Sequence, residues 1–211
     1  MQVNYRIPTF KEADTVQTRK HTKIRRQQII DIIRDIISAK GIEYVTIGEI
    51  SKRIGTTRGA IYRHFKSKRA ILSFLIDNIE ETLMEAIDKA MVHNDPILNL
   101  KNVLLAHLTY ARERRETSFI VIMGAMQFSD TIIRRKISLL IRKYLRKIEK
   151  ILTIAIQSGS VKKNINSMTS AIAFLGLIQA TVTVWSYKKF NFVPQKIHAQ
   201  LWNIYWQGIG V

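Results

Sequence analysis

Residues 45–68 read VTIGEISKRIGTTRGAIYRHFKSK, and this stretch decides the fold. Thr46, followed three residues later by Glu49, forms a capping box, in which each side chain satisfies a free backbone amide at a helix N-terminus. Apolar residues at positions 47, 50 and 54 predict a short helix over 47–54 that ends at Gly55. Thr57 can cap a second short helix over 58–65. Two short helices joined by a few residues that include a glycine predict a helix-turn-helix.

The second of these helices has two unlike faces. At 100° per residue, Ile61 and Phe65 point the same way and can pack against the first helix. Gly59 and Arg63 then point outward, with Tyr62 on the flank. One α-helix fits the major groove of DNA, where an arginine can reach a guanine edge or a phosphate. Each outward residue also has a plainer interpretation, as a solvated charge or a packing side chain.

Periodic apolar residues predict further helices on both sides of this motif. Their ranges are 25–39, 68–91, 96–114, 119–128, 131–157, 166–188 and 194–208. Only nine glycines and three prolines interrupt the chain, which favours helices over a turn-rich β fold. We therefore expect an all-α protein with a flexible tail over 1–21, a helix-turn-helix domain over 22–82 and a helical domain over 83–211.

The composition points to a polyanionic partner. The 211 residues include 34 Lys and Arg against 16 Asp and Glu, a formal charge of +18. Such an excess favours nucleic acid or an anionic membrane surface, although a generally basic surface also accounts for it. The chain has no cysteine, no glycine-rich phosphate loop and no His-Glu metal spacing, so we expect neither an enzyme nor a cofactor. Its N-terminus lacks the apolar run of a secretory signal, which fits a cytoplasmic protein.

Residues 30–41 and 45–72 closely resemble the TetR family of bacterial and archaeal repressors. The most specific part is Gly59, an apolar pair, Tyr62-Arg63-His64-Phe65 and then Lys66-Ser67-Lys68. The resemblance implies an N-terminal DNA-binding domain and a C-terminal ligand-binding and dimerisation bundle. A departure is Thr56-Thr57, where many relatives have an apolar residue and then a serine. The candidate DNA-binding residues, from the motif and the resemblance together, are Thr46, Thr56, Thr57, Arg58, Gly59, Tyr62, Arg63, His64 and Lys68.

Two of the predicted C-terminal helices differ in how their charged residues are distributed. The helix over 131–157 has an apolar side and a strongly basic side, which is either solvated or a contact for DNA or another acidic partner. No charged residue occurs between Lys163 and Lys188, so the helix over 166–188 is apolar nearly all round and is buried in protein or in lipid. The five polar side chains within its stretch from Met168 to Trp185 favour protein. We expect the helices over 166–188 and 194–208 to pair between two copies of the chain, as the resemblance also implies.

The resemblance further implies a ligand cavity in the C-terminal domain. Aromatic and methionine side chains at helical spacing there can line a cavity or simply fill a core. The candidates are His107, Tyr110, Phe119, Met123, Met126, Gln127, Ile178 and Trp185. The ligand we expect is a largely apolar small molecule, acyl or aromatic in kind.

These observations favour a homodimeric transcriptional regulator, by family default a repressor, that holds a double-stranded DNA operator and releases it when a small molecule binds. The alternative from the charge alone is an architectural protein that binds DNA of any sequence, but it leaves the C-terminal helices without a role. A small helical enzyme and a membrane-anchored protein have less support from the residues.

Overall fold

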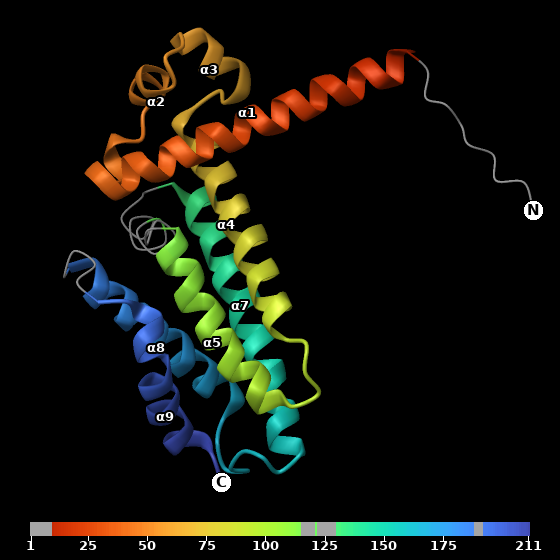
Figure 1. The fold of residues 1–211 in the computed structure, drawn as a ribbon, viewed down its shortest axis with the longest axis vertical. Helices are drawn as coiled ribbons and strands as arrows, with labels where there is room; N and C mark the ends of the chain where they lie inside the picture. The colour runs from red at the N-terminus through yellow and green to blue at the C-terminus, as the bar shows by residue number, and fades with distance from the viewer. Residues whose placement is uncertain (1–9, 115–120, 122–129, 188–191) are drawn as a thin grey trace, which may run out of the picture. The chain divides into compact units, whose positions relative to one another are not determined.

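The computed structural model describes residues 10–114, 121, 130–187 and 192–211, with side chains from residue 24 onward. The chain divides into two compact units, residues 1–70 and 71–211. The first unit contains α1 (Phe10–Lys40), the short 3-10 turn η1 (Ile42–Tyr44), α2 (Ile47–Ile54) and α3 (Arg58–His64) (Figure 1). The predicted pair of short helices is therefore present, and α2 has the predicted bounds.

The first helix begins earlier than we predicted. We expected an irregular tail up to residue 21, but α1 is helical from Phe10. The tail prediction was wrong for residues 10–21 because it relied on apolar periodicity, which this stretch lacks. Neither proline nor glycine occurs between Thr9 and Lys40, so nothing in the backbone chemistry stops the helix. Gly41, at φ 106 and ψ 166, ends it in a conformation that lies outside the left-handed helical region and that residues other than glycine rarely adopt.

Five α-helices are described in the second unit. α4 (Lys68–Ala90) begins three residues before it and continues into it, and α5 (Pro96–Glu113), α7 (Thr131–Gln157), α8 (Ser167–Tyr187) and α9 (His198–Ile209) follow. The last predicted helix was wrong at its start, because residues Pro194–Ile197 form the 3-10 turn η2 before α9 begins. The two compact units divide at Ala70, earlier in α4 than the domain boundary that we expected near residue 82. That boundary between a DNA-binding and a ligand-binding domain stays a prediction. The predicted helix over 119–128 lies outside the described residues, apart from position 121.

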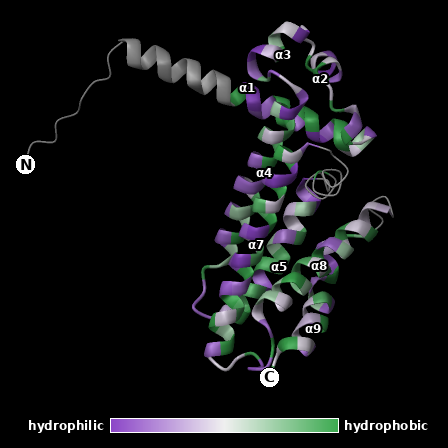
Figure 2. Cartoon of the chain, turned by 180° about the vertical axis from the view of Figure 1, so that it is seen from behind, coloured by the Kyte–Doolittle hydropathy of each residue, from purple (hydrophilic) through white to green (hydrophobic). Residues whose placement is uncertain are grey.

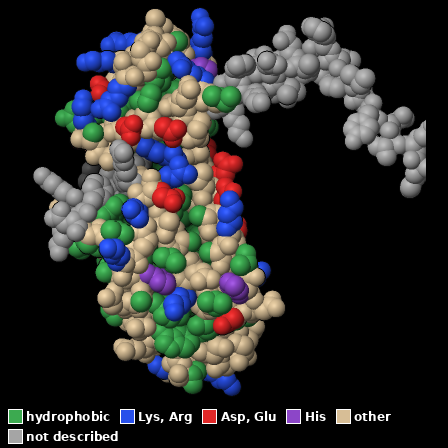
Figure 3. All heavy atoms as spheres, in the orientation of Figure 1, with side chains coloured by type: hydrophobic (Ala, Val, Ile, Leu, Met, Phe, Trp, Pro, Cys, Tyr) green, Lys and Arg blue, Asp and Glu red, His purple; other side chains and the backbone are tan. Residues whose placement is uncertain are grey.

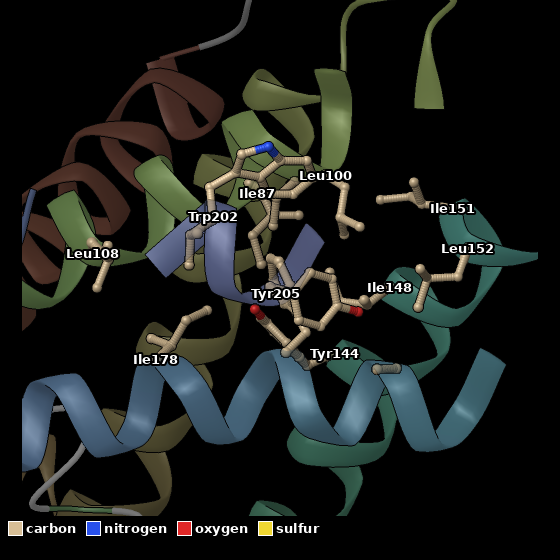
Figure 4. Close-up of a cluster of buried hydrophobic side chains, with 14 of the residues drawn as sticks. Ile87, Leu100, Leu108, Tyr144, Ile148, Ile151, Leu152, Ile178, Trp202 and Tyr205 are labelled. Atoms are coloured by element: carbon tan, nitrogen blue, oxygen red, sulfur yellow. The ribbon is translucent and has the colours of Figure 1, made fainter. Parts of the chain in front are cut away.

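The core of the second unit combines aliphatic and aromatic side chains from all five helices. Figure 4 shows Tyr144, Trp202 and Tyr205 among leucines and isoleucines from α4, α5 and α7. The Tyr205 hydroxyl donates to the Ser170 carbonyl at 2.9 Å, so the polar atom of this ring is satisfied inside the core. Burial of this kind is the main source of stability for a helical unit.

α4 and α7 are also joined on their outer sides by three ion pairs. Lys136 contacts Asp77, Lys143 contacts Glu80 at 2.6 Å and Lys147 contacts Asp88. α8 differs from α4 in hydropathy, since Figure 2 shows mostly hydrophobic or neutral colours along α8 and mixed colours along α4. By length and composition α8 could cross a membrane, yet only 28% of its most apolar 18-residue stretch is buried within the chain. One side of this apolar helix is therefore uncovered.

Candidate functional site

Two threonine caps set where the helices of the motif begin. The Thr46 hydroxyl accepts from the Glu49 amide at 3.1 Å, and the Thr57 hydroxyl accepts from the Ala60 amide at 3.2 Å. Both caps are as predicted. The prediction that the Glu49 side chain accepts from the Thr46 amide was wrong. The Glu49 carboxylate binds Lys40 at 3.0 Å and Arg53 at 3.2 Å instead. These hydrogen bonds to Lys40 and Arg53 lower the pKa of Glu49.

Glycine makes the turn between α2 and α3 possible. Gly55 has φ 70 and ψ 39, the left-handed conformation that glycine adopts without steric cost. The Thr56 amide then donates to the Ser51 carbonyl at 3.0 Å and closes the end of α2. Because this bond uses the backbone of Thr56, the turn closes although Thr56 stands where many relatives have an apolar residue.

The second helix of the motif presents the predicted face. Ile61 is 1% exposed and Tyr62 is 47% exposed, so neighbouring residues lie on opposite sides of α3. Six of the nine candidate DNA-binding residues are exposed, and the other three are partly buried. The exposed six are Thr46, Thr57, Arg58, Gly59, Tyr62 and Arg63, and the partly buried three are Thr56, His64 and Lys68. Figure 3 shows Lys and Arg side chains gathered over this unit.

The partly buried residues are tied into the domain. The Lys68 ammonium donates to the Glu43 carbonyl at 3.2 Å, so this cation is held against η1. The pKa of His64 is lowered by burial and by the nearby charges of Arg26, Arg25 and Arg63. The positive charges of these arginines at the end of α3 suit the approach of phosphate.

In the second unit, the structure places four of the eight ligand-pocket candidates. His107 is partly buried, with its Nδ1 3.0 Å from the Tyr144 hydroxyl, and desolvation lowers its pKa to about 4. The Tyr110 hydroxyl lies 2.9 Å from Oγ1 of Thr82, while Ile178 and Trp185 are buried in the core. His107 and Tyr110 therefore have different polar partners. The remaining candidates, Phe119, Met123, Met126 and Gln127, lie outside the described residues.

Sequence reasoning missed two contacts around these sites. The hydroxyl of Tyr144, in the helix predicted over 131–157, meets His107, 37 residues away. Arg58 was assigned to DNA, and the structure adds that its side chain lies against Gly48 of α2. Neither contact has a signal in local periodicity, because each joins residues on different helices.

Two capped short helices, a left-handed glycine turn and an exposed basic face define a helix-turn-helix DNA-binding protein. The family model for bacterial regulatory proteins of the tetR family matches residues 29–73, and the model for the C-terminal region of YsiA-like proteins matches residues 71–207. The chain therefore belongs to the TetR family, as its sequence indicated, and is a DNA-binding transcriptional regulator.

Matches to known proteins extend over most of this chain. The fatty acid metabolism regulator protein of Bacillus subtilis is 28% identical over 79% of this chain and 86% of its own length. The nucleoid occlusion factor SlmA of Glaesserella parasuis is 29% identical over 57% of this chain, and the match spans 60% of that protein's length. The structure of FadR from Bacillus subtilis in complex with stearoyl-CoA has a TM-score of 0.74 at 23% identity, covering 85% of this chain and 96% of that one.

Proposed function

We propose that this chain is a homodimeric cytoplasmic repressor that releases its operator when a long-chain acyl thioester binds in the second unit. The observation that carries the proposal is the exposed α3 face with its threonine caps, joined in one chain to a C-terminal region of the YsiA-like type. A DNA reader of this kind gains reach from two-fold symmetry, because two α3 helices enter successive major grooves roughly 34–36 Å apart.

The uncovered side of α8 supports dimerisation through α8 and α9. Ile172 and Val184 of α8 are 54% and 48% exposed, and Ile204 of α9 is 64% exposed. A Cβ on Gly176 would meet no atom within 4 Å, so this side of α8 offers small residues over which another helix can pack closely. A second copy would cover this apolar side, which accounts for an apolar helix that the chain itself leaves largely uncovered.

The interior of the second unit supports an apolar ligand. Its core is built mainly of aliphatic and aromatic side chains, and the polar groups there include the pair His107 and Tyr144. A long acyl chain matches such an interior, and a thioester carbonyl can accept a hydrogen bond from a neutral donor. The Bacillus subtilis relative is named for fatty acid metabolism, and the similar FadR structure holds stearoyl-CoA.

α4 is the element through which ligand can change DNA binding. It begins in the first unit and runs through the second to Ala90, so a shift of α4 changes both. Ligand that binds one position of α4 more tightly than the other moves the equilibrium towards that position. The spacing of the two α3 helices then no longer matches the operator.

The test begins with selection of duplexes from a random library by the full-length protein. Fluorescence anisotropy then measures its affinity for the selected duplex with stearoyl-CoA, with coenzyme A alone or with free stearate. We expect at least about a tenfold loss with stearoyl-CoA, which corresponds to 1.4 kcal/mol of coupling, and little change with coenzyme A. Failure to enrich any sequence would favour the architectural alternative. An enriched sequence with no response to stearoyl-CoA would reject the ligand class.

A further inference from the structure

The first residue of α3, Arg58, lies against α2. A Cβ built on Gly48 would stand 3.2 Å from Nη2 of Arg58, 3.5 Å from Nε and 3.6 Å from Cζ. All three atoms belong to the planar guanidinium group, so this group lies over the position where Gly48 lacks a side chain. A larger residue at position 48 would occupy the same space.

The neighbouring glycine of the motif behaves differently. A Cβ on Gly59 would meet only Oγ1 of Thr57, at an ordinary 3.8 Å. Gly59 therefore opens onto free space on the exposed side of α3, where close approach to DNA is needed. Gly48 is covered by the Arg58 side chain, so its role concerns that arginine.

The direction of Arg58 bears on what it contacts in DNA. In helix-turn-helix complexes the second helix enters the major groove, and the first helix crosses the sugar-phosphate backbone. An arginine at the start of the second helix can reach a guanine edge. Arg58 instead lies against the first helix, α2, and it has no ion-pair partner among the residues that the structure describes. A guanidinium in this place suits the oxygens of a backbone phosphate.

We propose that Gly48 is a positioning residue that holds Arg58 as a phosphate contact. Arg58 then contributes affinity that is independent of base sequence, and the reading of bases is left to the side chains further along α3, such as Tyr62 and Arg63. The inference rests on DNA binding by the first unit and makes no use of the ligand, so measurements made without ligand keep it separate from the test of ligand release.

The experiment compares Arg58→Ala, Gly48→Ala, Gly48→Leu and the double variant Gly48→Leu with Arg58→Ala in the full-length protein. The probes are the selected duplex and an unrelated duplex of equal length, each titrated over a range of salt concentrations. We expect Arg58→Ala to weaken binding to both duplexes by the same factor, about tenfold, and to lower the salt dependence by about one phosphate contact per subunit.

The two substitutions at Gly48 provide a graded series. Alanine requires the guanidinium to move by a few tenths of an ångström, and leucine takes its place, so the loss of affinity should grow from alanine to leucine and approach that of Arg58→Ala. Gly48 lies within α2, where alanine and leucine are better helix formers than glycine. The thermal midpoint of each variant should therefore be at least that of the unaltered chain, which separates a lost contact from a damaged fold.

A double-mutant comparison decides the point. If Gly48 acts through Arg58, the double variant binds no more weakly than Arg58→Ala alone. Equal losses from Gly48→Leu in both backgrounds would overturn the positioning role. Repeated selection with Arg58→Ala should return the same sequence, and a changed preference at one base pair would show that Arg58 reads that base.

Discussion

The helix-turn-helix surface and the outer side of α8 are both uncovered in this chain, but they differ in chemistry. The first carries threonine caps, a tyrosine and arginines on two short helices. The second is free of charge over a 21-residue helix and exposes Ile172, Val184 and small residues between them. A polar, basic surface matches a hydrated polyanion, and an apolar one matches another apolar surface.

The two units are also held together differently. The small first unit depends on caps and a left-handed glycine to fix the angle between its helices, with a modest apolar core beneath. The larger second unit buries a continuous core, and the polar groups in that core include the hydrogen-bonded pair of His107 and Tyr144. The first is therefore most sensitive to changes in local backbone chemistry, and the second to changes in packing and buried polarity.

The largest effect should come from a charge on the uncovered side of α8. We expect Ile172→Arg to convert the dimer to a monomer, because an arginine would be buried without a partner at the interface. The loss of one half-site should lower affinity for a selected duplex by about 100-fold or more. Light scattering after size exclusion reports the mass, and anisotropy reports the affinity.

A matched control lies on α7. Leu139 is 50% exposed, close to the 54% of Ile172, so Leu139→Arg makes the same chemical change at a similar exposure. We expect that variant to remain a dimer with unaltered affinity. If the unaltered chain is monomeric, or if it requires detergent and sediments with membranes, then the uncovered side of α8 is not a dimer interface.

The next largest effect concerns the buried polarity of the second unit. Burial lowers the pKa of His107 from 6.5 to about 4, so the unfolded chain binds a proton here at pH values where the folded chain does not. The corresponding stability is present above pH 6.5 and is lost as the pH falls towards 4, by about 2 kcal/mol at pH 5. Denaturant unfolding at fixed protein concentration measures this loss.

The control variants separate His107 from other acid-sensitive groups. His107→Gln should be less stable at pH 7 but should lose less on acidification, since the group that titrates is gone. His93→Gln, at an exposed position, should keep the full pH dependence. An unchanged pH dependence in His107→Gln would show that His107 is already charged or exposed in the folded protein.

A smaller effect is expected at the caps of the first unit. Thr57→Ala removes the hydroxyl that accepts from the Ala60 amide and should cost about 1 kcal/mol of unfolding free energy. The adjacent Thr56→Ala is the matched control, because the turn uses the backbone amide of Thr56. Hydrogen exchange of the amides in α3 localises the change, and equal protection in the two variants would argue against the cap.

The sequence predicted what depends on local spacing. The bounds of α2, both threonine caps and the left-handed Gly55 follow from residues within one or two helical turns of each other. The fate of Glu49 could not be predicted in the same way, because Lys40 reaches it from nine residues away and competes for its carboxylate. The contacts of Tyr144 with His107 and of Arg58 with Gly48 likewise depend on how helices pack.

The smallest effect should come from the ion pairs between α4 and α7. Lys143 and Glu80 are both partly solvated, so Lys143→Gln should cost no more than about 0.5 kcal/mol at low salt, and 1 M salt should remove most of the difference. Lys150→Gln is the control, because this exposed lysine of the same helix has no ion pair within the described residues. A loss well above 1 kcal/mol that persists in salt would mean that Lys143 is desolvated in the dimer, which would extend the covered surface from α8 onto α7.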